Sequence, residues 1–126
     1  MRLNENCIRD ILLTVEQNSM VGRQIPLSYY EQMDSLKKYS NDELVYHVNQ
    51  LQMNNLLLTN EQFLNFEIED LTPEGHALLA KIRNEQNWSK TKKIARSLGG
   101  LSILTLKVVA NSVFEKFVSD FIDSNF

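Results

Sequence analysis

Apolar side chains at the start of the chain recur with the spacing of an amphipathic helix. Four of them fall at positions i, i+3, i+4 and i+7 of one helical face: Ile8, Ile11, Leu12 and Val15. The pattern predicts a helix over about residues 5–17, and Asn18-Ser19 and Gly22 interrupt it. The Ile25-Pro26-Leu27 segment predicts a short edge strand, because proline lacks an N–H donor and favours extended backbone in the residue before it.

Two serine-led motifs predict the next helices. Ser28-Tyr29-Tyr30-Glu31 and Ser40-Asn41-Asp42-Glu43 both have the spacing of a capping box, in which the serine and glutamate side chains each accept a hydrogen bond from a backbone N–H group. The first motif predicts a helix of two or three turns. The second predicts a longer helix that ends near Asn54-Asn55, because asparagine tolerates the left-handed conformation found at helix C-termini. Two helices joined by a few residues are typical of a helix-turn-helix.

Alternation of apolar and polar residues predicts a β-hairpin after this helix. The expected strands are Leu56–Leu58 and Phe63–Ile68, and the expected loop is Thr59–Gln62. The Leu71-Thr72-Pro73-Glu74-Gly75 segment predicts another helix, in which the threonine is the N-cap and the proline occupies the first helical position. Its core-facing positions should be Leu78, Leu79 and Ile82. The order of elements predicts a mainly α-helical, winged helix-turn-helix core with a small β-hairpin.

The chain beyond Trp88 has a different character. A basic stretch leads to a Gly99-Gly100 hinge and then to a segment, about residues 101–122, that is apolar around most of a helix. Such a helix must be buried, so we predict a homodimer formed by antiparallel or domain-exchanged pairing. The candidate dimer contacts are Leu104, Val108, Val113, Phe114, Phe117 and Phe121. The alternative is that this helix folds back over its own core.

Length and composition fit one small domain with an appendage. The chain has 126 residues, of which 43% are hydrophobic, and this is enough to build a core. We therefore expect a winged-helix domain over residues 1–88, followed by a basic linker and C-terminal helical extension over residues 89–126.

Charge is distributed unevenly, although the formal net charge is only −3. Between Tyr39 and Ala80 there is no Lys or Arg, and the charged residues are all carboxylates: Asp42, Glu43, Glu61, Glu67, Glu69, Asp70 and Glu74. A basic cluster follows: Lys81, Arg83, Lys90, Lys92, Lys93 and Arg96. The predicted recognition helix and wing are thus anionic, and the segment after them is cationic.

This charge pattern bears directly on the class of partner. Binding to duplex DNA depends on cations that neutralise phosphates, so an anionic recognition region disfavours it. We expect a protein partner instead, with a basic site that the acidic surface could occupy by mimicking the phosphates of nucleic acid. The candidate protein-interaction face comprises Asp42, Glu43, Tyr46, His47, Gln50 and Glu61.

The alternative function is a DNA-binding transcriptional regulator. Amide side chains on the predicted recognition helix can read adenine edges. The candidate contacts to nucleic acid or to an acidic partner are Lys90, Lys92, Lys93 and Arg96. Those same cations could instead lie against the acidic wing of a second subunit.

The sequence offers no recognisable catalytic or metal-binding constellation. Cys7 is the single cysteine, cannot form an internal disulfide and should be a core side chain in a reducing, cytoplasmic setting. His47 and His76 form no ligand-spaced pair and should be hydrogen-bonded structural residues. No phosphate-binding glycine loop or nucleophile elbow is present. We therefore expect no enzyme, no metal and no cofactor. The longest apolar stretch, Leu101–Phe114, is shorter than the ~20 residues of a membrane span, so no membrane association is expected.

Three segments resemble a known family: YSNDELVYHVNQLQ, LTPEGHALLAKIRNEQNW and KTKKIA. They are similar to the Domain of Unknown Function 2513 family, small proteins encoded mainly by prophages and mobile elements of Gram-positive bacteria. The characteristic combination is Thr72, Gly75, His76, Ile82, Arg83, Trp88, Thr91 and Lys92. The element order also resembles winged-helix regulators of the multiple-antibiotic-resistance and PadR types. The resemblance implies a winged-helix core and a phage context, and no catalytic residues. In that context the expected protein partner is a host factor, and the alternative function is regulation of phage genes. Pro73 and Asn55 depart from the family pattern, which commonly has an aromatic residue and a glycine there.

Overall fold

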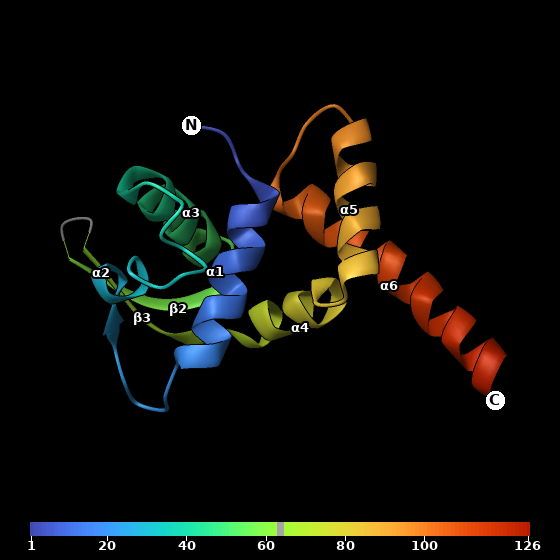
Figure 1. The fold of residues 1–126 in the computed structure, drawn as a ribbon, viewed down its shortest axis with the longest axis horizontal. Helices are drawn as coiled ribbons and strands as arrows, with labels where there is room; N and C mark the ends of the chain where they lie inside the picture. Colours follow the sequence, from blue (N-terminus) through green and yellow to red (C-terminus); the bar gives the residue numbers. More distant parts are fainter. Residues whose placement is uncertain (63–64) are drawn as a thin grey trace. The chain divides into compact units, whose positions relative to one another are not determined.

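The computed structural model describes residues 1–62 and 65–126. Over these residues the fold is mainly helical, with a three-stranded antiparallel sheet (Figure 1). The chain divides into two compact units, Met1–His76 and Ala77–Phe126, and each is described by itself. The division lies inside helix α4 (Pro73–Ile82), which is earlier than the boundary after residue 88 that the sequence suggested. None of the helices in the described part of the chain is long and apolar enough to cross a membrane.

Helix α1 (Glu5–Asn18) supplies much of the core of the first unit. It begins where the Asn4 side chain accepts hydrogen bonds from the backbone N–H groups of Asn6 and Cys7, at 3.0 and 3.3 Å. The predicted apolar face is fully buried: Cys7, Ile8, Ile11, Leu12 and Val15. The helix predicted from the periodicity is confirmed, and Cys7 is a core side chain as expected.

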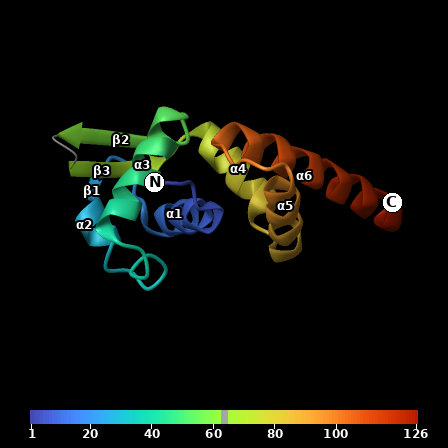
Figure 2. The ribbon, with the colours of Figure 1, turned by 90° about the horizontal axis from the view of Figure 1, so that it is seen from above.

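The sheet contains β1 (Ile25–Pro26), β2 (Leu57–Gln62) and β3 (Asn65–Leu71), in the order β1-β3-β2 (Figure 2). The expected short edge strand is present as β1. The expected loop at residues 59–62 is wrong, because these residues pair along β3 as far as Gln62 with Asn65. Their polar sequence suits an edge strand that is partly open to water. Phe63 and Leu64, which the sequence assigned to a strand, lie outside the described residues.

Only the second of the two predicted capping boxes forms. Helix α3 (Asn41–Met53) starts with a reciprocal pair of 3.1 Å hydrogen bonds, from Glu43 N to Ser40 Oγ and from Ser40 N to the Glu43 carboxylate. Helix α2 (Leu27–Tyr30) is instead a single turn, and its N-cap, Pro26, makes no side-chain cap bond. The predicted two- or three-turn helix is wrong, because the Glu31 carboxylate accepts a hydrogen bond from Asn41 Nδ2 rather than capping α2.

The junction between α3, the sheet and α4 has the predicted geometry. Asn55 adopts a left-handed conformation, with φ of 59°, just after α3. The Thr72 hydroxyl donates to the Asn55 carbonyl at 2.6 Å and accepts from Gly75 N at 2.9 Å, so Thr72 caps α4 as expected. A Cβ atom at Gly75 would lie 2.1 Å from the Leu56 carbonyl oxygen. Glycine is therefore required for this close approach.

The second unit is built from the end of α4, α5 (Glu85–Ser97) and α6 (Ile103–Asn125). Helices α5 and α6 pack side by side (Figures 1 and 2). The Asn84 side chain caps α5 by accepting from Gln86 N and Asn87 N at 2.9 and 3.0 Å. The basic stretch, for which the sequence predicted no helix bounds, forms α5, and the apolar helix predicted at residues 101–122 is present as α6. The core positions expected of α4 are buried: Leu78, Leu79 and Ile82.

Replacing Gly75 should destabilise the protein. Gly75→Ala places a Cβ against the Leu56 backbone carbonyl, and we expect the free energy of unfolding to fall by roughly 1–3 kcal/mol, as in other overpacked sites. The cost of this clash outweighs the ~1 kcal/mol by which alanine is favoured over glycine within a helix. Urea unfolding monitored by circular dichroism measures the change.

Gly100→Ala is the matched control, because nothing lies within 4 Å of a Cβ built at Gly100. It should stay within ~0.5 kcal/mol of the wild type. A Gly75→Ala protein as stable as this control would contradict the proposed close approach.

Candidate functional site

His47 is part of the core and not of the exposed face to which the sequence assigned it. Its side chain is 1% exposed. Nε2 accepts a hydrogen bond from the Asn4 backbone N–H at 2.9 Å, so Nδ1 carries the proton and donates to the Glu43 carbonyl at 2.7 Å. Burial lowers the pKa of His47, and the bond to Glu43 opposes that change only in part. His47 is thus a neutral structural histidine, as the alternative interpretation expected, and it joins α1 to α3.

The remaining members of the predicted protein-interaction face occupy different positions. Asp42 is exposed in the first turn of α3, and Glu43 is committed to the capping box. Tyr46 and Gln50 are half-buried farther along the same helix, and Tyr46 packs edge-on against the His47 ring at 5.0 Å. Glu61 is exposed on β2. Asp42, Tyr46 and Gln50 follow one another at helical spacing, while Glu61 belongs to a separate element.

A cleft of about 460 Å³ opens among α2, the start of α3 and β3, and we call it the acidic cleft. Its apolar wall is formed by Pro26, Leu27, Val45 and Phe66. Its polar lining consists of Ser28, Glu31, Asn41, Asn65 and Glu67. The cleft therefore combines two carboxylates, two amides and an apolar surface within the first unit.

Pairing between distant strands creates this cleft. The β1–β3 ladder sets Pro26 opposite Glu67, so the turn of α2 that follows Pro26 begins beside β3. On the other side, Asn41 at the start of α3 donates to the Glu31 carboxylate just after α2. Glu31 and Glu67 were not predicted as site residues. Glu31 has the spacing of a helix cap, and no local pattern in the sequence indicates that β1 pairs with β3.

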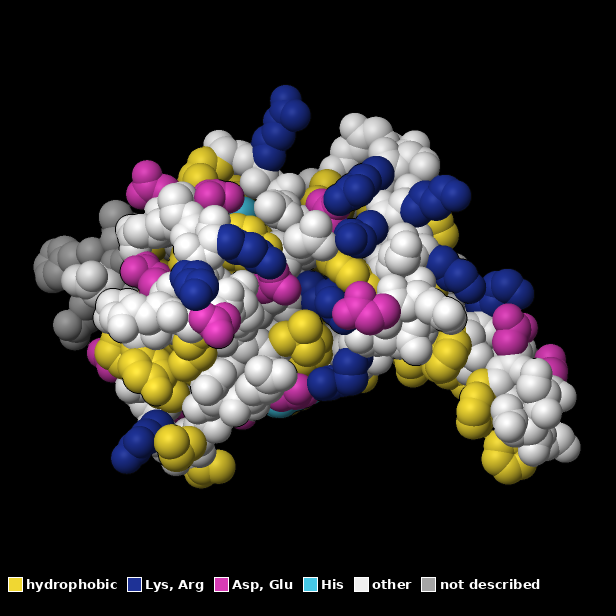
Figure 3. Space-filling model, in the orientation of Figure 1, with side chains coloured by type: hydrophobic (Ala, Val, Ile, Leu, Met, Phe, Trp, Pro, Cys, Tyr) yellow, Lys and Arg dark blue, Asp and Glu magenta, His cyan; other side chains and the backbone are white. Residues whose placement is uncertain are grey.

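The lysines that precede α3 are engaged with carboxylates outside the cleft. Lys37 pairs with Asp34 at 2.9 Å, and Lys38 pairs with Asp10 at 3.1 Å while lying 5.3 Å from the centre of the Tyr39 ring. Among the described residues that line the cleft there is no Lys or Arg. On the face of the molecule drawn in Figure 3, acidic side chains lie over α3 and the hairpin. Many of the Lys and Arg side chains visible on that face lie over α5.

The cleft has the chemistry of a receptor for a cationic side chain. Carboxylates form charge-assisted hydrogen bonds with guanidinium and ammonium groups. The apolar wall can take the aliphatic stem of Arg or Lys while the charged head reaches Glu31 or Glu67. The lining contains no cysteine or histidine, and in the described part of the chain no group of three His, Cys, Asp or Glu could hold a metal ion. Burial, with Glu43 and Asp10 adding to it, raises the pKa of Cys7 to about 12, so its thiol stays neutral in the core.

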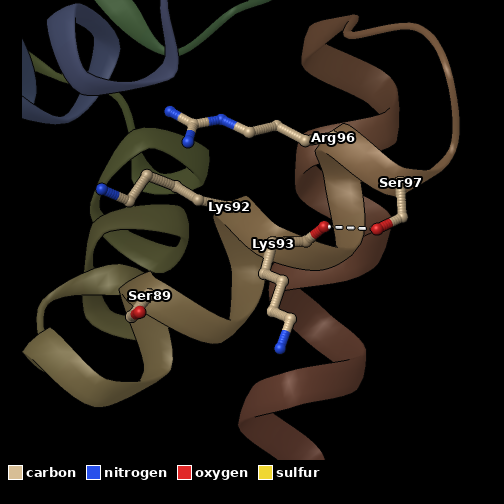
Figure 4. Close-up of a pocket in the computed structure, with 5 residues that line it drawn as sticks. All are labelled: Ser89, Lys92, Lys93, Arg96 and Ser97. Atoms are coloured by element: carbon tan, nitrogen blue, oxygen red, sulfur yellow. Dashed lines mark hydrogen bonds between the residues drawn. The ribbon is translucent and has the colours of Figure 1, made fainter.

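The basic residues singled out on α5 divide between two surfaces. A pocket of about 470 Å³ is lined by Ser89, Lys92, Lys93, Arg96 and Ser97. Figure 4 shows Lys92 and Arg96 extending to one side while Lys93 points away from them, and the Ser97 hydroxyl donates to the Lys93 carbonyl at 2.8 Å. The Lys92 ammonium also lies 5.6 Å from the centre of the Trp88 ring, within cation–π range. Lys90 lies outside this pocket and belongs to a second groove.

The predicted dimer contacts on α6 are only partly at the surface. The exposed ones are Leu104, Val108, Phe117 and Phe121. Val113 is 8% exposed and Phe114 is half-buried, with its ring 6.2 Å from that of Phe117. Within a single chain, Val113 is therefore mostly covered, and its remaining surface lines a groove between α5 and α6.

Comparisons with known proteins give a family and no activity. A family profile described as "Hypothetical protein (DUF2513)" matches residues 2–102. A Haemophilus influenzae protein described as "Uncharacterized protein" is 30% identical over 127 residues, which covers 94% of this chain and 100% of that protein. No solved structure matches the chain.

Stability should depend on the protonation of His47. A histidine whose pKa is lower in the folded state than its ordinary 6.5 stabilises the fold above that value, and this contribution is lost as the pH falls below it. Protonation of Nε2 would also remove the acceptor for Asn4 N. We expect the free energy of unfolding to fall between pH 7.5 and pH ~5.5 more steeply for the wild type than for His47→Gln.

Urea titrations of both proteins across this range test the dependence. Carboxylates titrate in both proteins alike, so the difference between their slopes isolates His47. Parallel slopes would show that His47 does not contribute through a neutral buried imidazole.

Proposed function

The chain belongs to the family described as "Hypothetical protein (DUF2513)", and on that premise we propose a non-enzymatic binding protein that holds a cationic protein partner in its acidic cleft. The family description attaches no activity to it. The proposed partner is a host factor met in the cytoplasm by a protein of prophage or mobile-element origin. The single observation that carries the proposal is the pair of carboxylates, Glu31 and Glu67, on an apolar cleft whose lining has no described cation.

We further propose that the first unit is a winged-helix domain. The order α1, β1, α2, α3, β2, β3, α4 is that of such domains, with α3 as recognition helix and β2–β3 as wing. The three-stranded sheet supports this interpretation, since β1 and β2 flank β3 as in a winged helix. In this scheme the acidic cleft lies between the start of the recognition helix and the wing strand β3.

The position of these charges disfavours a nucleic-acid ligand at the cleft. A phosphate brought between Glu31 and Glu67 would meet like charge, and Asp42 extends the anionic surface along the first turn of α3. A basic segment of a protein that normally holds nucleic acid would meet opposite charge instead. This supports occupation of a host protein's nucleic-acid site by charge mimicry.

A DNA-binding regulator is the second candidate. Lys92 and Arg96 extend to the same side of α5, and such a pair can contact successive phosphates (Figure 4). In that case binding would be tight at low salt and would fall steeply as salt is raised.

Neutralising the two cleft carboxylates should weaken binding to a cationic peptide. We expect Glu31→Gln with Glu67→Gln to raise the Kd for a fluorescent nona-arginine peptide roughly tenfold, because two charge-assisted contacts are lost. Fluorescence anisotropy at two salt concentrations measures it. The double variant Asp34→Asn with Glu115→Gln, which removes two exposed carboxylates outside the cleft, should bind like the wild type.

The same proteins decide between the two candidate functions. Equal loss of peptide binding in both double variants would show non-specific charge attraction and remove the cleft from consideration. Salt-sensitive binding to duplex DNA that is lost in Lys92→Ala with Arg96→Ala would establish the regulator instead. Affinity capture from a host lysate, with the cleft variant as the comparison, then identifies proteins that depend on Glu31 and Glu67.

A further inference from the structure

The second unit contains a groove that the acidic cleft proposal does not use. It lies between α5 and α6 and has a volume of about 480 Å³. Its apolar part includes Ile94, Val113 and Phe117. Three lysines also line it, Lys90 and Lys93 from α5 and Lys116 from α6. We call it the lysine groove.

A buried amide in the wall of this groove has no partner. Asn87 is 2% exposed and lines the groove, and its Nδ2 makes no hydrogen bond within the described part of the chain. A buried donor without an acceptor destabilises a fold, so such groups in native proteins usually meet a ligand, a water or another chain. The lysine groove thus combines three lysines and one carboxylate, Asp120, with an apolar wall, and the unpartnered Asn87 amide lies buried in that wall.

The last turns of α6 carry the complementary chemistry. After Lys116 the helix has no further Lys or Arg, and its charged residues are Asp120 and Asp123. Its apolar side chains are exposed: Phe121 by 53%, Ile122 by 50% and Phe126 by 95%. Figure 3 shows apolar and acidic side chains close together at the C-terminal end of α6. Large apolar side chains gathered in this way mark an interaction surface.

We propose that the end of α6 from a second copy of this chain fills the lysine groove, and that the exchange is reciprocal. We place the two α6 helices antiparallel, so that Phe117 of one copy meets Phe117 of the other. Phe121 of one copy then lies opposite Val113 of the other, since each is four positions from Phe117. Such a contact is isologous and closes as a dimer. It covers the exposed aromatic residues of both copies with the apolar wall of the groove.

Charge favours this arrangement over a random hydrophobic contact. The carboxylates of Asp120 and Asp123 approach the groove lysines of the other copy, where Lys90 and Lys93 lie on α5. Within one chain, Lys116 already pairs with Asp120 at 3.4 Å, one helical turn apart, and both side chains are exposed. The same pairing between chains, in a partly desolvated groove, is stronger than on an open surface.

Reciprocal charge reversal tests this inference on the full chain. Lys90→Glu with Lys93→Glu reverses the groove, and Asp120→Lys with Asp123→Lys reverses the docked helix. Each double variant alone should raise the dimer dissociation constant, measured by sedimentation velocity, at least about tenfold relative to the wild type. An equimolar mixture should restore wild-type dimer formation, because each groove then meets a helix of opposite charge. Restoration in trans cannot arise from misfolding of either variant.

A control variant carries the same charge reversal as the groove variant, at sites outside the second unit. Arg23→Glu with Lys37→Glu makes the same change of charge at exposed sites of the first unit and should leave the dimer intact. A wild type that stays monomeric over the concentration series, or a mixture that fails to restore dimers, overturns the proposal. Because the acidic cleft is unaltered in every variant, failure here leaves the peptide-binding experiment unaffected.

Discussion

The junction at which α3 ends and α4 begins determines the geometry of the first unit. Thr72 bonds the Asn55 carbonyl through its hydroxyl at 2.6 Å and the Leu56 carbonyl through its backbone N–H at 3.1 Å. Gly75 allows the first turn of α4 to approach that same Leu56 carbonyl. Because the Thr72–Leu56 hydrogen bond joins the start of β2 to the end of β3, β3 returns along β2. The other edge of β3 pairs with β1. This arrangement sets Glu67 opposite the entry to α2 and completes the acidic cleft.

The second interaction that fixes the first unit is the hydrogen bond between α1 and α3 through His47, which is neutral. An imidazolium has only donors, so it could not accept the hydrogen bond from Asn4 N. Burial disfavours the charged imidazolium, and the acceptor needed at Nε2 excludes it as well. Both effects therefore require a neutral imidazole, and the acceptor at Nε2 places its proton on Nδ1. The bond joins the N-cap residue of α1 to the middle of α3 and holds the polar face of α3 outward. A residue that the sequence assigned to an exposed interaction face thus belongs to the buried framework of the first unit.

The sequence predicted those elements whose signals are complete within a few residues. Periodicity identified α1, and the reciprocal Ser40–Glu43 cap identified α3. The similar motif at residues 28–31 failed because Asn41, distant in sequence, takes the Glu31 carboxylate. Helix α5 was predicted less clearly, because its many charged residues hide a short buried stripe: Trp88, Thr91 and Ala95, at spacings of three and four. Those residues and the Asn84 cap were the available signals.

The candidate sites were harder to predict because each depends on contacts between distant segments. Neither the acidic cleft nor the lysine groove is visible as a motif, since one requires the pairing of β1 with β3 and the other the packing of α5 on α6. What the charge pattern did convey was the sign of each surface. In both proposed sites an apolar wall stands beside charges that are all acidic in the cleft and mainly basic in the lysine groove, where Asp120 is the exception. The two proposals follow from this chemistry: a cleft lined by carboxylates disfavours phosphate and suits a cation, and the lysine groove suits an acidic, apolar helix such as the end of α6.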